Sequence, residues 1–208
     1  MIRKDETMNK IILASGSPRR REIMQQVGIE FDIETSEEEE LYHSTEPEEI
    51  VKELALMKAQ AVAGYHEKRG ITVIGADTVV VYDGKILGKP KDEDDAYRMI
   101  EMLQGEYHQV YTGVAILDYD TGGKEQIISH AEETKVYVVS MEPEEIRTYI
   151  ATKEPMDKAG AYGIQGYFAA YIGRIEGDYY NVVGLPIAYV NSELKKIRER
   201  SKSPQTAN

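Results

Sequence analysis

The sequence contains no cysteine, which excludes disulfides and metal sites built on thiolates. Its four histidines, His43, His66, His108 and His130, show none of the spacings typical of metal ligands. No apolar run approaches the roughly 18 to 20 residues of a membrane helix. The charged first ten residues lack the apolar core of a signal peptide. We therefore expect a cytoplasmic protein with no membrane partner.

Positive charge is also scarce, because 37 acidic residues outnumber 25 basic ones and the formal net charge is −12. General nucleic-acid binding needs a basic surface, so we expect no nucleic-acid partner. The length of 208 residues, of which 41% are hydrophobic, suffices for one core. We expect a single domain over residues 10–200, an extension over residues 1–9 and a frayed tail over residues 201–208. A homodimer stays an open alternative.

Apolar periodicity predicts strands alternating with helices, without internal repeats. The expected strands are 11–15, 29–33, 72–82, 107–118 and 125–139, and the expected helices are 18–27, 47–64, 92–103, 143–151 and 186–200. Asp83-Gly84 is typical of a hairpin turn. Residues 153–166 are expected to form an ordered loop, and residues 167–175 and 179–183 a hairpin. This order predicts the α/β class, and the long consecutive strands indicate a mixed sheet.

The segment from Ser15 to Arg21 is the most informative part of the chain. Ser17 suits the N-cap of a helix and Pro18 its first position. Arg19 and the two arginines after it then lie in the first turn, where the helix dipole disfavours cations. Backbone N–H groups, hydroxyls and guanidinium groups gathered in one place indicate a bound phosphate. The alternative is an arginine face exposed to solvent.

Three further charged residues lie at positions where a purely structural role does not readily explain the charge. Lys58 falls on the apolar stripe of the expected helix 47–64, so it must extend to solvent or meet an anion. Asp77 lies within an apolar strand, where a carboxylate pairs with a cation, binds a metal or acts as a base. Gly88-Lys89-Pro90 is a turn that would present an ammonium group at the edge of a cleft. Together with the arginines, these are the groups that a phosphoryl-handling site needs.

The acidic run from Glu37 to Glu40 has two interpretations. Such a run is usually a solvated loop. One member could instead bind a divalent cation together with Asp77, since hard cations prefer carboxylate oxygens.

The sequence resembles the Maf family of nucleotide pyrophosphatases in five blocks that occur in family order. They are LASGSPRR at 13–20, IGADTVV at 74–80, LGKP at 87–90, EPMDKAGAYGIQG at 154–166 and VGLP at 183–186. Several long motifs in order are far more specific than one short pattern. The resemblance spans about residues 10 to 195.

This resemblance implies a Maf/ITPase-like fold, an elongated mixed sheet flanked by helices, with a central cleft between two lobes. It implies hydrolysis of a nucleoside triphosphate to the monophosphate and pyrophosphate with Mg²⁺ or Mn²⁺. Asp77 would be the catalytic proton acceptor, and it would share the metal with Glu39. Whether Asp77 is mainly base or metal ligand stays open. The substrate-binding positions implied are Ser15, Arg19, Arg20, Lys58 and Lys89.

The resemblance also points to a substrate class. Within the family, the subgroup similar to dTTP/UTP pyrophosphatases carries Arg, Thr and Gln at three positions that match Arg19, Thr78 and Gln165. Gln165 can donate and accept a hydrogen bond at once, so we hypothesise that it reads the O4 and N3–H edge of uracil or thymine. The alternatives are a purine-selective pyrophosphatase on the same fold and a nucleotide-binding regulator of cell division without essential turnover.

Overall fold

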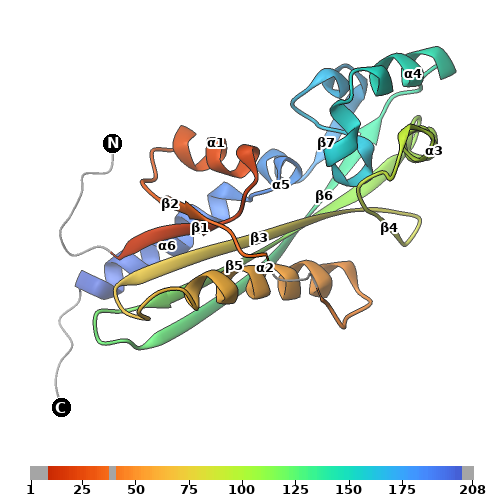
Figure 1. Ribbon diagram of the computed structural model, residues 1–208. Helices are drawn as coiled ribbons and strands as arrows, with labels where there is room; N and C mark the ends of the chain where they lie inside the picture. Colours follow the sequence, from red (N-terminus) through yellow and green to blue (C-terminus); the bar gives the residue numbers. More distant parts are fainter. Residues whose placement is uncertain (1–8, 38–40, 203–208) are drawn as a thin grey trace.

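Figure 1 traces the computed structural model, which describes residues 9–37 and 41–202. The elements in chain order are β1 (Lys10–Ala14), α1 (Pro18–Gln26), β2 (Asp32–Glu34), α2 (Pro47–Ala63), β3 (Ile71–Tyr82), β4 (Lys85–Leu87), α3 (Glu93–Leu103), β5 (Tyr107–Tyr119), β6 (Glu125–Val138), α4 (Pro143–Ala151), the 3₁₀ turns η1 (Glu154–Asp157), η2 (Ala159–Ala161) and η3 (Tyr167–Tyr171), β7 (Ile172–Glu176), α5 (Tyr179–Val183) and α6 (Ile187–Lys202).

Within the described residues, the strands form one seven-stranded sheet in the order β2-β1-β3-β5-β6-β7, with β4 paired to β3. β1 runs parallel to β2 and β3, and the other pairings are antiparallel. The sheet is therefore mixed, as predicted. In Figure 1 the long strands β3, β5 and β6 run the length of the molecule and join two lobes. One lobe holds β1, β2 and α1, and the other holds α3, α4 and β7.

Each face of the sheet is buried by its own helices, because successive side chains of a strand point to opposite faces. Ile12 and Val73 pack with Ala55 and Ala59 of α2 on one face. Leu13 and Ile74 belong to the larger cluster on the other face, which includes side chains from α1, α3, α4, α5 and α6. Figure 1 shows α2 alone beneath the sheet and α1, α5 and α6 above it.

Helix α2 lies unusually close to the sheet, because two glycines face it. A Cβ added at Gly75 would lie 2.1 Å from the carbonyl oxygen of Ala55, and one at Gly113 would lie 2.1 Å from that of Val51. No side chain fits at either position unless the helix moves away. This close approach determines where the next turn of α2, which carries Lys58, meets β3.

We expect Gly75→Ala to destabilise the protein by about 1–3 kcal/mol, because the added methyl group overpacks the interface between α2 and β3. Denaturant unfolding would measure the change in the free energy of unfolding. Gly88→Ala is the matched control, since a Cβ at Gly88 meets nothing within 4 Å. Equal stability of the Gly75 and Gly88 variants would contradict the close packing described here.

A gap in the pairing of β3 opens the sheet at its middle. β1 pairs with β3 only as far as Gly75, and β4 pairs with β3 only from Val80 onward. On this edge the four positions from Ala76 to Val79 have no neighbouring strand among the described residues, while β5 pairs with their other edge. Asp77 and Thr78 point to opposite faces of the sheet, yet both reach the space that the gap leaves.

Most predicted elements are confirmed to within a residue or two, including the Asp83-Gly84 turn between β3 and β4. The second strand was placed too early, since β2 covers Asp32–Glu34 rather than residues 29–33. Ile29 is instead buried in the core next to α1. The expected ordered loop over residues 153–166 contains the turns η1 and η2.

The predicted hairpin over residues 167–183 is wrong. Its first half is the 3₁₀ turn η3 followed by the short strand β7, and its second half is the helix α5. The β-favouring residues of this segment are overridden by a cap, because the carboxylate of Asp178 accepts a hydrogen bond from the backbone N–H of Tyr180 at 2.8 Å. Such a cap starts a helix where the turn sequence suggested a hairpin.

The expected N-terminal extension, apart from Asn9, lies outside the described residues. α6 continues through Lys202, two residues beyond the predicted end of that helix, and the rest of the predicted tail lies outside the described residues. Within the described part of the chain, no helix is both long and apolar enough to cross a membrane.

Candidate active site

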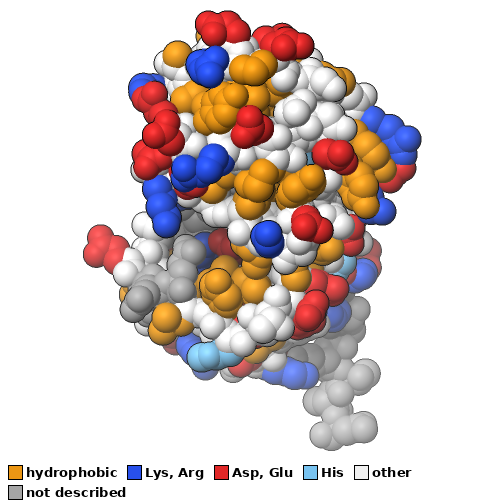
Figure 2. Space-filling model, turned by 90° about the vertical axis from the view of Figure 1, so that its right-hand side faces the viewer, with side chains coloured by type: hydrophobic (Ala, Val, Ile, Leu, Met, Phe, Trp, Pro, Cys, Tyr) orange, Lys and Arg blue, Asp and Glu red, His pale blue; other side chains and the backbone are white. Residues whose placement is uncertain are grey.

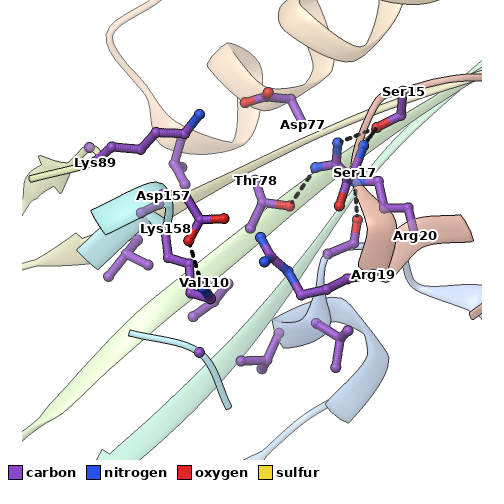
Figure 3. Close-up of a pocket in the computed structure, with 18 of the residues that line it drawn as sticks. Ser15, Ser17, Arg19, Arg20, Asp77, Thr78, Lys89, Val110, Asp157 and Lys158 are labelled. Carbon is purple, nitrogen blue, oxygen red and sulfur yellow. Dashed lines mark hydrogen bonds and ion pairs between the residues drawn. The ribbon is translucent and has the colours of Figure 1, made fainter. Parts of the chain in front are cut away.

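A cleft of about 1040 Å³ opens at the gap between β1 and β4. Its walls come from the loop between β1 and α1, from α2, from β3, from the turn after β4, from residues 154–166 and from α5. Figure 3 shows Asp77 and Thr78 between Lys89 on one side of the cleft and Ser15 with Arg20 on the other. The sequence nominated Ser15, Arg19, Arg20, Lys58, Asp77, Thr78, Lys89 and Gln165, and all of them lie in this lining. Arg21 and Glu37, which belong to the arginine cluster and the acidic run, are exposed and lie outside it.

Arg20 is held by three different elements. Its Nε donates to the carbonyl oxygen of Gly184 at 2.7 Å, Nη1 donates to Ser15 Oγ at 3.0 Å and Nη2 donates to Thr78 Oγ1 at 3.0 Å. Gly184 has a φ of 121°, and a Cβ there would lie 3.5 Å from Arg20 Nε. The guanidinium plane is thus fixed in the cleft wall, as Figure 3 shows.

The start of α1 has the geometry that the sequence predicts, except for the cap. Ser17 occupies the N-cap and Pro18 the first helical position, so Arg19 lies in the first turn with no acidic residue beside it. The Ser17 side chain makes no capping hydrogen bond, and its backbone N–H instead donates to Ser15 Oγ at 3.3 Å. The positive end of α1 therefore faces the same cleft as Arg19 and Arg20, an arrangement suited to an anion.

A half-buried lysine and a buried aspartate pair with each other. Lys58 Nζ lies 2.5 Å from Asp77 Oδ1, and the two side chains are 20% and 12% exposed. This contact follows from the close packing of α2, because Gly75 lies two residues before Asp77 on the same face of β3. Of the alternatives that the sequence left open, Lys58 meets an anion and Asp77 pairs with a cation. The pair stands at the cleft wall.

The segment from Glu154 to Gly166 forms the opposite wall. It is tied to the Lys89 turn, because Gly160 N–H donates to the carbonyl oxygen of Gly88 at 3.0 Å. Within it, Lys158 Nζ donates to Asp157 Oδ1 at 2.6 Å and to the carbonyl oxygen of Glu154 at 2.7 Å. The hydrogen bond from Lys158 lowers the pKa of Asp157 below its usual value, and the charge of Arg19 across the cleft adds to this.

Glu154 clamps the turn that carries Gln165. Its Oε2 accepts a hydrogen bond from the backbone N–H of Tyr167 at 2.9 Å, and its Oε1 accepts one from the Tyr149 hydroxyl at 3.1 Å. A Cβ at Gly166 would lie 2.2 Å from either carboxylate oxygen, so a larger residue there would displace the Glu154 carboxylate. The side chain of Gln165 is exposed where it lines the cleft.

Sequence reasoning assigned no role to Glu154, Asp157 or Lys158, although all three line the cleft. The signal available was a cluster of charges inside a segment otherwise rich in glycine and alanine. The charges could not be distinguished from those of a solvated loop until the fold placed them opposite Arg19.

Basic side chains gather in the cleft of an otherwise acidic protein. The described lining contains the basic residues Arg19, Arg20, Lys58, Lys89 and Lys158 and the acidic residues Asp77, Glu154 and Asp157. On the face in Figure 2, by contrast, basic and acidic side chains alternate between separate apolar patches. A local excess of positive charge in a concave site attracts a multiply charged anion.

The described residues do not form a metal cage of their own, since no group of three His, Cys, Asp or Glu side chains is positioned to hold an ion. Glu39, the second predicted metal ligand, lies outside the described residues. A single carboxylate such as Asp77 still suits Mg²⁺, which proteins commonly hold with one or two carboxylates while substrate phosphates and water supply the other oxygens.

Comparison with known proteins shows the family of this chain. The model of the family described as Maf-like protein matches residues 10–197. The chain belongs to the Maf family. The match extends from the first strand into α6, so the whole described sheet and the cleft lie inside the Maf domain.

Curated Maf relatives are similar along nearly their whole length. A protein of Lachnoclostridium phytofermentans named dTTP/UTP pyrophosphatase is 52% identical over 189 residues, which cover 91% of this chain and 95% of that protein. A protein of Bacillus cytotoxicus with the same name is 50% identical over 190 residues, covering 91% and 96% of the two chains.

Solved structures match more distantly. The Ham1 protein of Staphylococcus aureus is 14% identical with a TM-score of 0.48, covering 90% of this chain and 99% of that chain. A protein of Mycobacterium abscessus titled nucleoside-triphosphatase / dITP/XTP pyrophosphatase is 13% identical with a TM-score of 0.38, covering 95% and 100%. Likeness at this level adds nothing to the Maf fold described above.

Proposed function

We propose that this Maf protein hydrolyses dTTP and UTP to the nucleoside monophosphate and pyrophosphate. The observation that carries the proposal is the paired carboxylate Asp77 in a cleft lined with basic side chains. The names of the curated relatives, dTTP/UTP pyrophosphatase, support the choice of reaction and substrate. A cytoplasmic location accords with such a substrate and belongs to the same proposal.

In the proposed reaction the oxygen of a water molecule bonds to the α-phosphorus. The bond from that phosphorus to the oxygen bridging the α- and β-phosphates breaks, and pyrophosphate leaves with the electron pair. Asp77 accepts the proton of the water. Lys58, which donates to one oxygen of that carboxylate, orients it. Arg19, Arg20 and Lys89 neutralise the charge of the triphosphate and of the leaving pyrophosphate.

Mg²⁺ or Mn²⁺ belongs to this proposal, held by Asp77 together with Glu39 and the phosphate oxygens of the substrate. When bound, such an ion neutralises phosphate charge and polarises a coordinated water. The side chains of Asp77 and Glu39 are chemically suited to this role, because hard cations prefer carboxylate oxygens.

The proposal is tested by measuring product release from a panel of pyrimidine and purine nucleoside triphosphates, with Mg²⁺ and with Mn²⁺. We expect dTTP and UTP to be turned over fastest, and the products to be the monophosphate and pyrophosphate in equal amounts. Release of orthophosphate with the diphosphate would instead indicate attack at the γ-phosphorus and contradict the proposal.

Other outcomes separate the alternatives. Turnover of purine nucleotides alone would retain the reaction and discard the role given to Arg19, Thr78 and Gln165 in substrate choice. Nucleotide binding without turnover of any panel member would favour the regulator of cell division.

A further inference from the structure

A line of hydrogen-bonded hydroxyl groups runs from the cleft along the face of the sheet that α1 and α5 cover. Arg20 Nη2 donates to Thr78 Oγ1 at 3.0 Å. Thr78 Oγ1 lies 2.9 Å from Oγ1 of Thr112, its direct partner across the pairing of β3 with β5. Thr112 Oγ1 donates to the carbonyl oxygen of Asn181 in α5 at 2.9 Å. Thr112 is fully buried and lies outside the lining of the cleft.

The direction of every hydrogen bond in this line is determined by chemistry. A threonine hydroxyl has one proton to donate. Thr112 gives its proton to a carbonyl oxygen, which can only accept, so its oxygen must accept the proton of Thr78. The hydroxyl of Thr78 then donates its proton to Thr112 rather than into the cleft, and the oxygen of Thr78 accepts a hydrogen bond from Arg20. Thr78 therefore has no proton left to donate to a nucleotide.

Arg20 is connected to the segment around α5 in two ways. Arg20 Nε donates directly to the carbonyl oxygen of Gly184, at the C-terminal end of α5, while Nη2 reaches the carbonyl oxygen of Asn181 through the two threonines. Asn181 is itself fixed, because its Nδ2 donates to the carbonyl oxygen of Val110 at 3.0 Å and to Thr134 Oγ1 at 2.9 Å. The guanidinium group of Arg20 is thereby anchored twice to the segment that contains α5, on the same face of the sheet.

We propose that Thr112 and Asn181 are positioning residues of this active site. They orient the hydroxyl of Thr78 so that it accepts from Arg20, and Thr78 affects the substrate through Arg20 rather than by donating to it. This inference rests on the proposed function only in taking Arg20 as a ligand of the triphosphate. An arginine that loses one of its anchors can rotate, and misplacement by about 1 Å can cost up to about 10²-fold in rate.

The test uses Thr112→Val, which keeps the shape of the side chain and removes its hydroxyl, and Thr112→Ser, which restores the hydroxyl. We expect Thr112→Val to lower kcat/KM for dTTP by on the order of 10-fold and to weaken binding of inorganic tripolyphosphate, measured by calorimetry. We expect Thr112→Ser to remain within about twofold of the wild-type protein in both measurements.

Thr72→Val is the matched control. Thr72 is also a buried threonine of the sheet, and its Oγ1 donates to Asp118 Oδ1 at 2.6 Å, outside the lining of the cleft. We expect the melting temperature of the Thr72→Val variant to fall as much as that of Thr112→Val, while its kcat/KM and its affinity for tripolyphosphate stay unchanged. If the two variants lose the same activity, Thr112 has a merely structural role and the proposal is overturned.

A second comparison tests whether Thr112 acts through Thr78. In a Thr78→Val background the further change Thr112→Val should cost nothing more, because the link to Arg20 is already broken. If Thr112→Val lowered kcat/KM equally in the wild-type and Thr78→Val backgrounds, Thr112 would not act through Thr78. Tripolyphosphate contains no nucleobase. Its binding therefore tests whether Thr112 positions Arg20 even if the panel shows that dTTP and UTP are not the substrates.

Discussion

Replacing Asp77 by asparagine is expected to lower kcat for dTTP and UTP by on the order of 10²-fold or more. The amide oxygen can still accept the hydrogen bond that Lys58 donates to Asp77 at 2.5 Å, so the local packing is retained. The amide cannot accept a proton from water at neutral pH. The charge of Lys58 is no longer balanced by a carboxylate, so we expect triphosphate binding in the absence of a divalent metal to be unchanged or tighter. Steady-state kinetics and calorimetry with a non-hydrolysable dTTP analogue would measure both effects.

Asp118→Asn is the matched control for this prediction. Asp118 is also buried in the sheet, where its carboxylate accepts hydrogen bonds from Thr72 and Asn9. The control variant should lose stability and keep kcat. A fully active Asp77→Asn protein would refute Asp77 both as base and as metal ligand.

Replacing Gln165 by glutamate is expected to lower kcat/KM for dTTP and UTP by about 10²-fold. An ionised carboxylate can only accept hydrogen bonds, so it cannot donate to the O4 atom of uracil or thymine. It also adds a negative charge to a cleft that receives a triphosphate. The affinities for Mn²⁺ and for tripolyphosphate, neither of which contains a base, should change much less than the turnover of the nucleotides.

Gln60→Glu makes the same substitution on an exposed position of α2, outside the lining of the cleft, and should leave turnover unchanged. If Gln165→Glu weakened the binding of Mn²⁺ as much as it weakens the turnover of dTTP, the role of Gln165 at the base edge would have to be abandoned.

The sequence was most informative where physical constraints are local. The apolar periodicity of α2 and β3 predicted both elements closely, and the Ser17-Pro18 pair predicted the start of α1. Local rules failed at residues 167–183, where β-favouring residues follow the Asp178 cap into a helix. They failed there because the Asp178 cap starts a helix whose residues have only a weak intrinsic preference for a strand.

The sequence by itself determined the family motifs, the mixed α/β class and the set of charged residues that were candidates for the site. Only the tertiary structure decided which of them meet. Lys58 reaches Asp77 because Gly75 and Gly113 let α2 approach the sheet, and Asp77 and Thr78 share one cleft because β1 ends before β4 begins. Thr112 and Asn181 looked like ordinary residues of two predicted strands. Their link to Arg20 depends on strand register and helix packing between segments far apart in the chain, which local sequence patterns do not encode.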